Sequence, residues 1–392
     1  MRPIETSLVL AALTLSFTTE LSAQGCLSNA ARTGTKGDTQ HWSRSDDSRQ
    51  SITVRWRRGD CEIRIDARGD FGVKPDLTGF TAVEDGGWVD IQERDGDTER
   101  RLRVVGKGRD LEYRWTIDGR NGFDVNRDRW LADILVAMER RTAMFAKWRV
   151  PELVRTGGVK AVLDETEQMP SDYAKRTYYS HLLNAARLTD ADQERLMRQT
   201  ALMSSDYERS ETVRMLAKQG PVSDRVARAM IAVAQGMGSD YEKRRALSAG
   251  LESVASADSR TALFAAASTM SSSYELAELL IAAQRRSLVD SLTSDAYFRA
   301  VGRLSSDYER RRTLSALMKL RPTATAVLTG VLQSSQSISS DYELASLLVE
   351  FARTVDVRGP LREAYLKATR TLSSDYEYRR ALQALLEQDR RS

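Results

Sequence analysis

The sequence has very little of the two side chains that most often bind metals or act as catalytic bases. Only two histidines, His41 and His181, and two cysteines, Cys26 and Cys61, occur among 392 residues. A two-histidine metal site would have to join His41 to His181, which lie far apart in the chain, and a Ser-His-Asp arrangement would have to use one of these two. We also find no HExxH, GxSxG or Walker A motif. We therefore predict no enzyme activity, no catalytic or metal-binding residues and no cofactor; a hydrolase using paired carboxylates stays open as an alternative.

Long apolar runs and an excess of one charge are missing as well. Beyond the N-terminal region, no segment reaches the roughly 20 apolar residues that a membrane-spanning helix needs. The 59 basic and 55 acidic residues give a net charge of +4, and arginines alternate with acids instead of forming a basic stripe. Since nucleic-acid surfaces need such a stripe, we expect no nucleic-acid partner.

The N-terminus has the pattern of an export signal. Arg2 precedes an apolar stretch over residues 8–17, and the small-residue exit Leu21-Ser22-Ala23 follows. The sequence therefore predicts a signal peptide over 1–23 and an exported, periplasmic or secreted protein without a transmembrane segment. Cys26 and Cys61 are then candidates for a disulfide. The alternative is a lipid anchor on Cys26 after cleavage within "AQGC".

Residues 24–48 are polar and rich in Gly, Ser and Thr, which is typical of a flexible linker. A period of two then begins, with Ile52, Val54 and Trp56 on one face, and turn sequences such as "RRGD", "RDGD" and "DGRNG" interrupt it at short intervals. This pattern predicts a small antiparallel β-meander domain over residues 49–120.

Helical periodicity starts after Asp124, which can cap a helix containing Trp130. We expect a helical junction over 121–170. From residue 171 a motif, mostly Ser-Asp-Tyr-Glu, returns seven times, and its tyrosines are spaced 34, 34, 33, 34, 34 and 34 residues apart. These tyrosines are Tyr173, Tyr207, Tyr241, Tyr274, Tyr308, Tyr342 and Tyr376. Two helical stretches lie between successive motifs, so residues 171–392 are predicted to form an α-solenoid of about seven helix-hairpin repeats.

The motif fits the start of a helix. Its serine is expected at the N-cap and its glutamate at N3, where the two would form a reciprocal capping box. The aspartate at N1 complements the positive helix end, and the tyrosine at N2 is expected to pack on the preceding repeat. The predicted caps are Ser171, Ser205, Ser239, Ser272, Ser306, Ser340 and Ser374. Ala174 replaces the glutamate once and Ser273 the aspartate once, which favours a structural role over catalysis.

The later repeats alternate between two versions. "EKRRAL", "ERRRTL" and "EYRRAL" follow Tyr241, Tyr308 and Tyr376, whereas "ELAELL" and "ELASLL" follow Tyr274 and Tyr342. We infer duplication of a two-repeat block and predict that the first-helix surfaces alternate in charge along the array. Equal solvent exposure of the basic and apolar versions would contradict this. The basic version supplies the candidate partner-binding residues Arg244, Arg245, Arg311, Arg312, Arg379 and Arg380.

The repeated "SDYE" helical hairpin resembles that of bacterial envelope proteins of unassigned function, and similar repeats occur outside the membrane in some BlaR/MecR-like sensor peptidases. The stretch from "DGRNGFDVNRDRWLADIL" to "GGVKAVLDETEQMPSDYAKRTYYSHLL" is similar to the junction between their β-domain and repeats, so the resemblance covers roughly residues 85–392. It implies a TPR/HEAT-like solenoid. Because the peptidase motif is missing here, it transfers no activity and no site residues.

These observations predict an α+β multidomain protein that acts as an exported, non-enzymatic scaffold. Solenoids present extended surfaces, and we expect this one to bind a protein or peptide partner. The alternative is an envelope sensor or regulatory module that works with a membrane peptidase or kinase.

Overall fold

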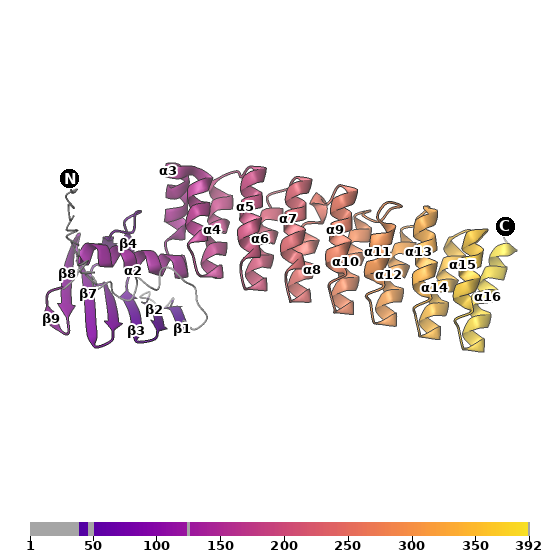
Figure 1. Cartoon of the computed structure of the whole chain (residues 1–392), viewed down its shortest axis with the longest axis horizontal. Coiled ribbons are helices and arrows are strands. Elements are labelled where there is room, and N and C mark those ends of the chain that lie inside the picture. Colours follow the sequence, from indigo (N-terminus) through magenta and orange to yellow (C-terminus); the bar gives the residue numbers. More distant parts are fainter. Residues whose placement is uncertain (1–38, 46–50, 124–125, 391–392) are drawn as a thin grey trace, which may run out of the picture. The chain divides into compact units, whose positions relative to one another are not determined.

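The computed structural model describes residues 39–45, 51–123 and 126–390 (Figure 1). They divide into two compact parts whose boundary falls between Ala137 and Met138. The predicted signal peptide over 1–23 and the possible lipid site at Cys26 lie outside the described residues. Cys61 is disulfide-bonded. In the part of the chain that the structure describes, no helix is long and apolar enough to cross a membrane.

The first part confirms the predicted β-meander. Within the described residues its antiparallel sheet has seven strands in the order β1-β2-β3-β6-β7-β8-β9, and most of them follow their neighbour through a two-residue turn. The strands are β1 (Thr39–Ser45), β2 (Ser51–Arg58), β3 (Cys61–Arg68), β6 (Trp88–Asp95), β7 (Thr98–Lys107), β8 (Asp110–Ile117) and β9 (Arg120–Asn121). At the last turn Asp118 and Gly119 both have positive φ, which the Asp-Gly sequence accommodates.

Two features of the sheet differ from the sequence prediction. Thr39–Ser45, placed in the linker 24–48, forms β1 and pairs antiparallel with β2. This strand is specified by main-chain pairing, which a polar composition does not signal. A second hairpin, β4 (Phe71–Val73) and β5 (Phe80–Val83), is inserted between β3 and β6. Gly106 allows its close approach to β7, because a Cβ there would lie 2.3 Å from two main-chain carbonyls.

One face of the sheet is apolar and carries the helix α2 (Arg127–Thr142) (Figure 1). Val54, Ile65 and Leu102 are buried on that face, and Trp130 of α2 packs edge-on against Trp115. The side chain of Asn126 accepts a hydrogen bond from the amide of Arg129 at 3.0 Å. Asn126 therefore caps the helix; the predicted cap, Asp124, lies outside the described residues.

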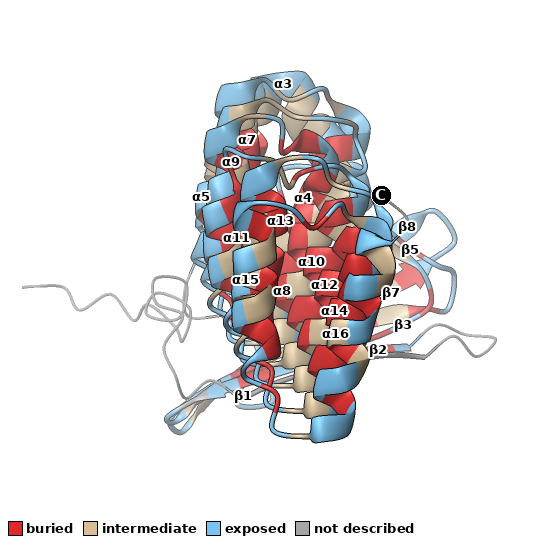
Figure 2. Cartoon of the chain, turned by 90° about the vertical axis from the view of Figure 1, so that its right-hand side faces the viewer, coloured by how far each residue is buried: buried red, intermediate tan, exposed pale blue. Residues whose placement is uncertain are grey.

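The second part confirms the predicted helical repeats. Its helices stand in two layers with the apolar side chains buried between them (Figure 2). The helices that begin with the motif form the A layer: α4 (Asp172–Ala185), α6 (Asp206–Ala217), α8 (Asp240–Ala249), α10 (Ser273–Arg285), α12 (Asp307–Lys319), α14 (Asp341–Thr354) and α16 (Asp375–Asp389). The others form the B layer: α3 (Ala146–Glu167), α5 (Asp190–Ala201), α7 (Asp224–Gln235), α9 (Ala257–Ala267), α11 (Ser294–Val301), α13 (Thr325–Ser335) and α15 (Pro360–Thr369).

The helical part starts earlier than the first motif. α3 packs against α4 and α5, so much of the stretch 121–170, expected as a junction, belongs to the array. Gly158 breaks α3 into two segments, since its φ of 68° and ψ of −170° are not helical. A side chain would be strained at that φ, which explains why glycine stands at the break.

Candidate functional site

The seven motifs meet along one edge of the A layer, which we call the motif edge. Each of the seven predicted cap serines stands at an N-cap, and its hydroxyl accepts the amide of the N3 residue at 3.2–3.4 Å. The hydroxyl satisfies one of the amides that a helix leaves unpaired at its start. The serine therefore serves helix formation.

The aspartate of the motif ties one repeat to the next. The Asp307 carboxylate accepts the amides of Ser339 and Ser340, at 3.0 and 2.8 Å, just before the following A helix begins. Equivalent pairs of hydrogen bonds from main-chain amides are accepted by Asp172, Asp206, Asp240 and Asp341. We call this contact the aspartate staple. A carboxylate that accepts two amides forms charge-assisted bonds, so it stabilises the interface between repeats.

The exception in the fourth repeat preserves the staple. Ser273 stands where the other repeats have aspartate, and its hydroxyl accepts the amides of Ser305 and Ser306 at 3.0 and 3.3 Å. The substitution thus keeps an acceptor at the same place and removes its charge.

The staple also explains why the predicted capping box does not form in these motifs. The N-cap amide that the glutamate was expected to accept already bonds to the aspartate of the preceding repeat, as Ser205 does with Asp172 at 2.9 Å. The motif glutamate binds arginine instead: Glu208 pairs with Arg176 of the first repeat. Ala174, the glutamate-free variant, is fully buried.

The glutamates and arginines form an alternating network. In the first, third and fifth repeats the arginine three residues after the tyrosine reaches forward: Arg176 pairs with Glu208, Arg244 with Glu275 and Arg311 with Glu343. The next arginine reaches backward as well as to its own motif. Arg312, for example, contacts Glu278 of the fourth repeat and Glu309 of its own, both at 2.7 Å.

This network changes the interpretation of the predicted partner-binding arginines. Five of the six donate to a neighbouring repeat or to their own motif glutamate: Arg244, Arg245, Arg311, Arg312 and Arg380. These contacts compensate the charges of the five guanidinium groups and hold the repeats together. Arg379 is exposed.

The motif tyrosines are exposed, contrary to the expectation that they pack on the preceding repeat. Their exposed fractions range from 41% at Tyr173 to 74% at Tyr376. We call Tyr173, Tyr207, Tyr241, Tyr274, Tyr308, Tyr342 and Tyr376 the tyrosine row. The amides near each ring already donate hydrogen bonds to the cap serine or to the aspartate staple. The tyrosine at N2 therefore points its ring outward at the start of the helix.

Arginines of the network lie under several of these rings. Arg311 is 5.5 Å from the ring centre of Tyr308 in its own repeat, and Arg312 is 5.9 Å from that of Tyr274 in the preceding one. Similar contacts involve Tyr173, Tyr241 and Tyr342. Such cation–π contacts hold the rings in place while their outer faces remain accessible.

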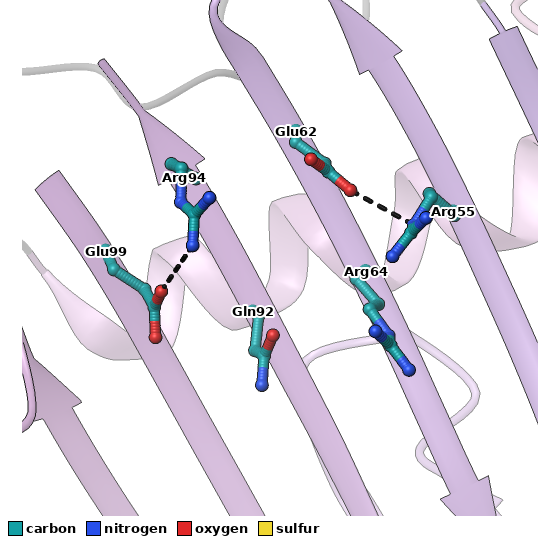
Figure 3. Close-up of a pocket in the computed structure, with 6 residues that line it drawn as sticks. All are labelled: Arg55, Glu62, Arg64, Gln92, Arg94 and Glu99. Atoms are coloured by element: carbon teal, nitrogen blue, oxygen red, sulfur yellow. Dashed lines mark hydrogen bonds and ion pairs between the residues drawn. The ribbon is translucent and has the colours of Figure 1, made fainter. Parts of the chain in front are cut away.

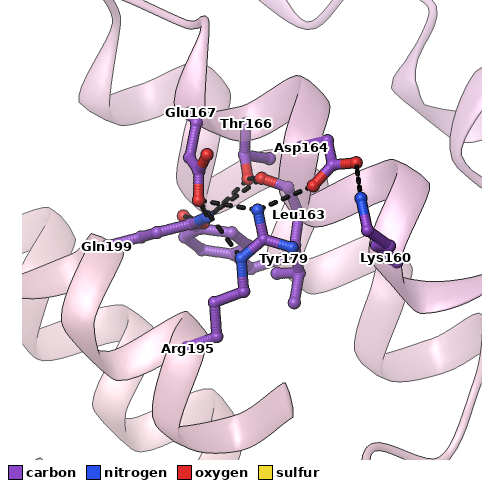
Figure 4. A network of polar contacts seen from close by, with 8 residues as sticks. All are labelled: Lys160, Leu163, Asp164, Thr166, Glu167, Tyr179, Arg195 and Gln199. Atoms are coloured by element: carbon purple, nitrogen blue, oxygen red, sulfur yellow. Dashed lines mark hydrogen bonds and ion pairs between the residues drawn. The ribbon is translucent and has the colours of Figure 1, made fainter.

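A buried polar cluster near the start of the array was missed from sequence (Figure 4). Gln199 accepts from Thr166 and Tyr179 and donates to the carbonyl of Leu163 and to Glu167, with all four bonds between 2.7 and 2.9 Å. Every polar group of the amide is thereby used, and burial raises the pKa of the Tyr179 hydroxyl. The cluster therefore joins α3, α4 and α5 and leaves no polar group of Gln199 for a substrate.

The open face of the sheet carries a shallow polar depression of about 160 Å³, opposite the face that α2 covers (Figure 3). Its carboxylates are paired with arginines across the strands: Arg55 with Glu62 and Arg94 with Glu99, both at 3.0 Å. Paired in this way, the two carboxylates do not form the acid–base dyad that a hydrolase would need.

Of the two histidines, His181 is half-buried in α4, where burial and the nearby charge of Lys147 lower its pKa. The side chain of His41 is not described. Among residues 39–45, 51–123 and 126–390, no group of three or more His, Cys, Asp or Glu side chains could hold a metal ion.

Comparisons with known proteins leave the family unassigned. No protein-family model and no curated protein matches the sequence. Among solved structures, one similar chain comes from the computational design of self-assembling cyclic homooligomers. It is 14% identical, the match covers 66% of this chain and 99% of that chain, and the TM-score is 0.14. So low a TM-score supports no statement about a shared fold or function, and the similarity to BlaR/MecR-like repeats remains a prediction.

Proposed function

We propose that the chain is a non-enzymatic scaffold that binds protein or peptide partners along the helical array, with the tyrosine row as its contact surface. The observation that carries the proposal is the exposure of all seven motif tyrosines, 41–74%. Large aromatic side chains are enriched in the centres of protein interfaces, where they bury much area at a small cost in conformational entropy.

The other motif residues have roles in the fold, and the tyrosine is the one whose side chain faces solvent. The serine caps its helix, the aspartate or Ser273 staples the next repeat, and the glutamate pairs with arginine. An exposed aromatic ring at the same place in every repeat is not required for packing. Exposed apolar surface marks interaction sites. Cation–π contacts pre-organise the rings of Tyr173, Tyr241, Tyr274, Tyr308 and Tyr342.

Export to the bacterial envelope, predicted from residues 1–23, is part of the same proposal. The N-terminal sequence of the secreted or periplasmic protein tests it: a mature chain that starts at Gln24 supports export, and intact Met1 in the cytoplasm contradicts it.

Crosslinking in cells that express the full chain tests the binding function. A photoreactive amino acid is placed next to the row, at Arg379, in the wild type and in a triple variant, Tyr241→Ala, Tyr274→Ala and Tyr308→Ala. We expect specific protein crosslinks, identified by mass spectrometry, that the triple variant loses.

The control replaces two exposed leucines elsewhere on the array, Leu292→Ser and Leu320→Ser, which are 80% and 51% exposed. This variant should keep the crosslinks. If both variants capture the same proteins in equal yield, the tyrosine row is not the contact surface and the proposal is wrong.

A further inference from the structure

The tyrosine row has a fixed step. Each tyrosine follows the staple residue directly, and the staple joins the start of one A helix to the start of the next, as Asp206 does with Gly238 and Ser239 at 2.8 Å. Packed helices lie about 8–10 Å apart. Successive rings are therefore separated by about the same distance along the whole row.

A regular row favours a ligand whose own repeat has the same length, since each additional ring then binds without further ordering cost. Polyproline II helix advances about 9 Å in three residues and returns to the same face at each turn. An extended strand returns to the same face after about 7 Å, and an α-helix after seven residues, about 10.5 Å. Of these three repeats, only that of polyproline II falls within the 8–10 Å spacing of packed helices.

The chemistry of the row agrees with this geometry. Proline-rich segments bind aromatic-lined surfaces, and their carbonyl groups have no internal hydrogen-bond donors. The exposed rings offer apolar faces for the proline side chains, and their hydroxyl groups can donate to those carbonyls.

Charge points to the same class of ligand. The cations beneath the rings are paired with carboxylates, Arg244 with Glu275 and Arg312 with both Glu278 and Glu309. A row whose arginines are compensated in this way complements an uncharged ligand better than an acidic one.

We infer that the tyrosine row binds an uncharged, proline-rich peptide segment in the polyproline II conformation, with a proline at every third residue over successive rings. The inference rests on the proposed scaffold function and names the class of its partner.

Fluorescence anisotropy with the full chain tests this inference. The probes are labelled peptides of six and of three copies of Pro-Pro-Ala, a Gly-Ser-Ala peptide of the longer length, and a hexamer of β-1,4-linked glucose. We expect the longer proline peptide to bind about tenfold or more tightly than the shorter one. Its affinity should change less than about twofold between about 50 and 500 mM salt, because no charges pair on binding.

The triple variant Tyr241→Ala, Tyr274→Ala and Tyr308→Ala should weaken binding of the longer peptide about tenfold or more. The variant with Leu292→Ser and Leu320→Ser should bind like the wild type, and circular dichroism checks that both are folded. Equal binding of the Gly-Ser-Ala peptide, preference for the glucose hexamer, or no binding of the proline peptide would overturn the inference. If the wild type still forms protein crosslinks that depend on the tyrosines, the scaffold proposal survives that failure; if the wild type forms no such crosslinks, both are wrong.

Discussion

Odd-numbered and even-numbered repeats share one fold but use the same position in different ways. Three residues after the motif tyrosine, the first, third and fifth repeats have arginine, with 22–26% of each side chain exposed. The second, fourth and sixth have Ser210, Ala277 and Ala345, all fully buried. The basic and apolar versions therefore differ in exposure, as the alternating sequences predict.

The difference shows that neighbouring repeats are complementary partners. The arginine of an odd repeat extends to the glutamate of the even repeat that follows, as in the pair of Arg311 and Glu343. The even repeat has no such arginine to extend, and its small residue is enclosed. The structural unit of the array is thus a pair of repeats, and four experiments test this conclusion.

The largest effect on stability should come from placing the arginine of the odd-numbered repeats at the equivalent position of an even-numbered repeat. Ala345→Arg would force a long cation into a fully buried position, where the acid at the equivalent of Glu343, Glu377, is already paired with Arg380, at a cost of about 3 kcal/mol or more. Urea unfolding measures the loss. The reverse change, Arg311→Ala, removes one partly buried ion pair and should cost about 1 kcal/mol. Equal losses for the two variants would show that the repeats are interchangeable.

Loss of a staple should cost more stability where the acceptor is an aspartate than where it is Ser273, and this difference should be smaller than the first. Asp307→Ala removes two charge-assisted bonds and should lower the free energy of unfolding by about 2 kcal/mol, whereas Ser273→Ala removes two neutral ones and should cost about 1 kcal/mol. Ser273→Asp should stabilise the array, because it restores the acceptor that the other staples use. The midpoint of urea unfolding ranks the three variants; loss of stability in Ser273→Asp would show that the fourth joint requires a neutral group.

Acidification should weaken the aspartate staples more than the staple formed by Ser273. The Ser373 hydroxyl, with the amides of Ser373 and Ser374, lowers the pKa of Asp341 against the opposing effect of burial. Its folded pKa is below the unfolded value of about 3.9, so its contribution is full above that value and is lost as pH falls toward the folded pKa. Between about pH 5 and pH 3 the protein should lose more stability than its Asp341→Asn variant.

Ser273 does not titrate in this range and provides the internal control. Amide-exchange protection at Ser305 and Ser306 should fall less on acidification than protection at Ser373 and Ser374. Parallel losses at both joints would contradict the role of the carboxylate.

The smallest effect on stability is expected from the tyrosine row. Tyr241→Ala should change the free energy of unfolding by less than about 0.5 kcal/mol, because the ring is half exposed. Thermal unfolding measures the change, with the fully buried Tyr297 as the matched comparison, where truncation to alanine should cost about 3 kcal/mol or more. A large loss at Tyr241 would make the row part of the fold.

Much of the architecture could be predicted because it is encoded locally. Alternating Ile52, Val54 and Trp56 indicate a strand, and the seven cap serines stand where the motif places them. The staple could not be predicted in this way, since its partners are 31 to 33 residues apart and aspartate at N1 already has a local explanation in the helix dipole. One signal was present: Asp and Ser273 share only the ability to accept a hydrogen bond, which points to a donor nearby.

The exposure of the tyrosines was missed for a related reason. A residue that recurs in every repeat is normally taken for a packing residue, and an aromatic side chain strengthens that interpretation. The strand β1 was missed because its pairing with β2, and not its own composition, specifies it.

The pairing of repeats has a consequence for how such an array can evolve. Unequal recombination that removes or inserts two adjacent repeats keeps odd and even repeats alternating, so each forward-reaching arginine still meets the motif glutamate of an even repeat. Removal of a single repeat would bring two odd or two even neighbours together, with a guanidinium meeting another or an enclosed methyl group losing its cover. Related chains should therefore differ in length by even numbers of repeats, so that their arrays share the same parity.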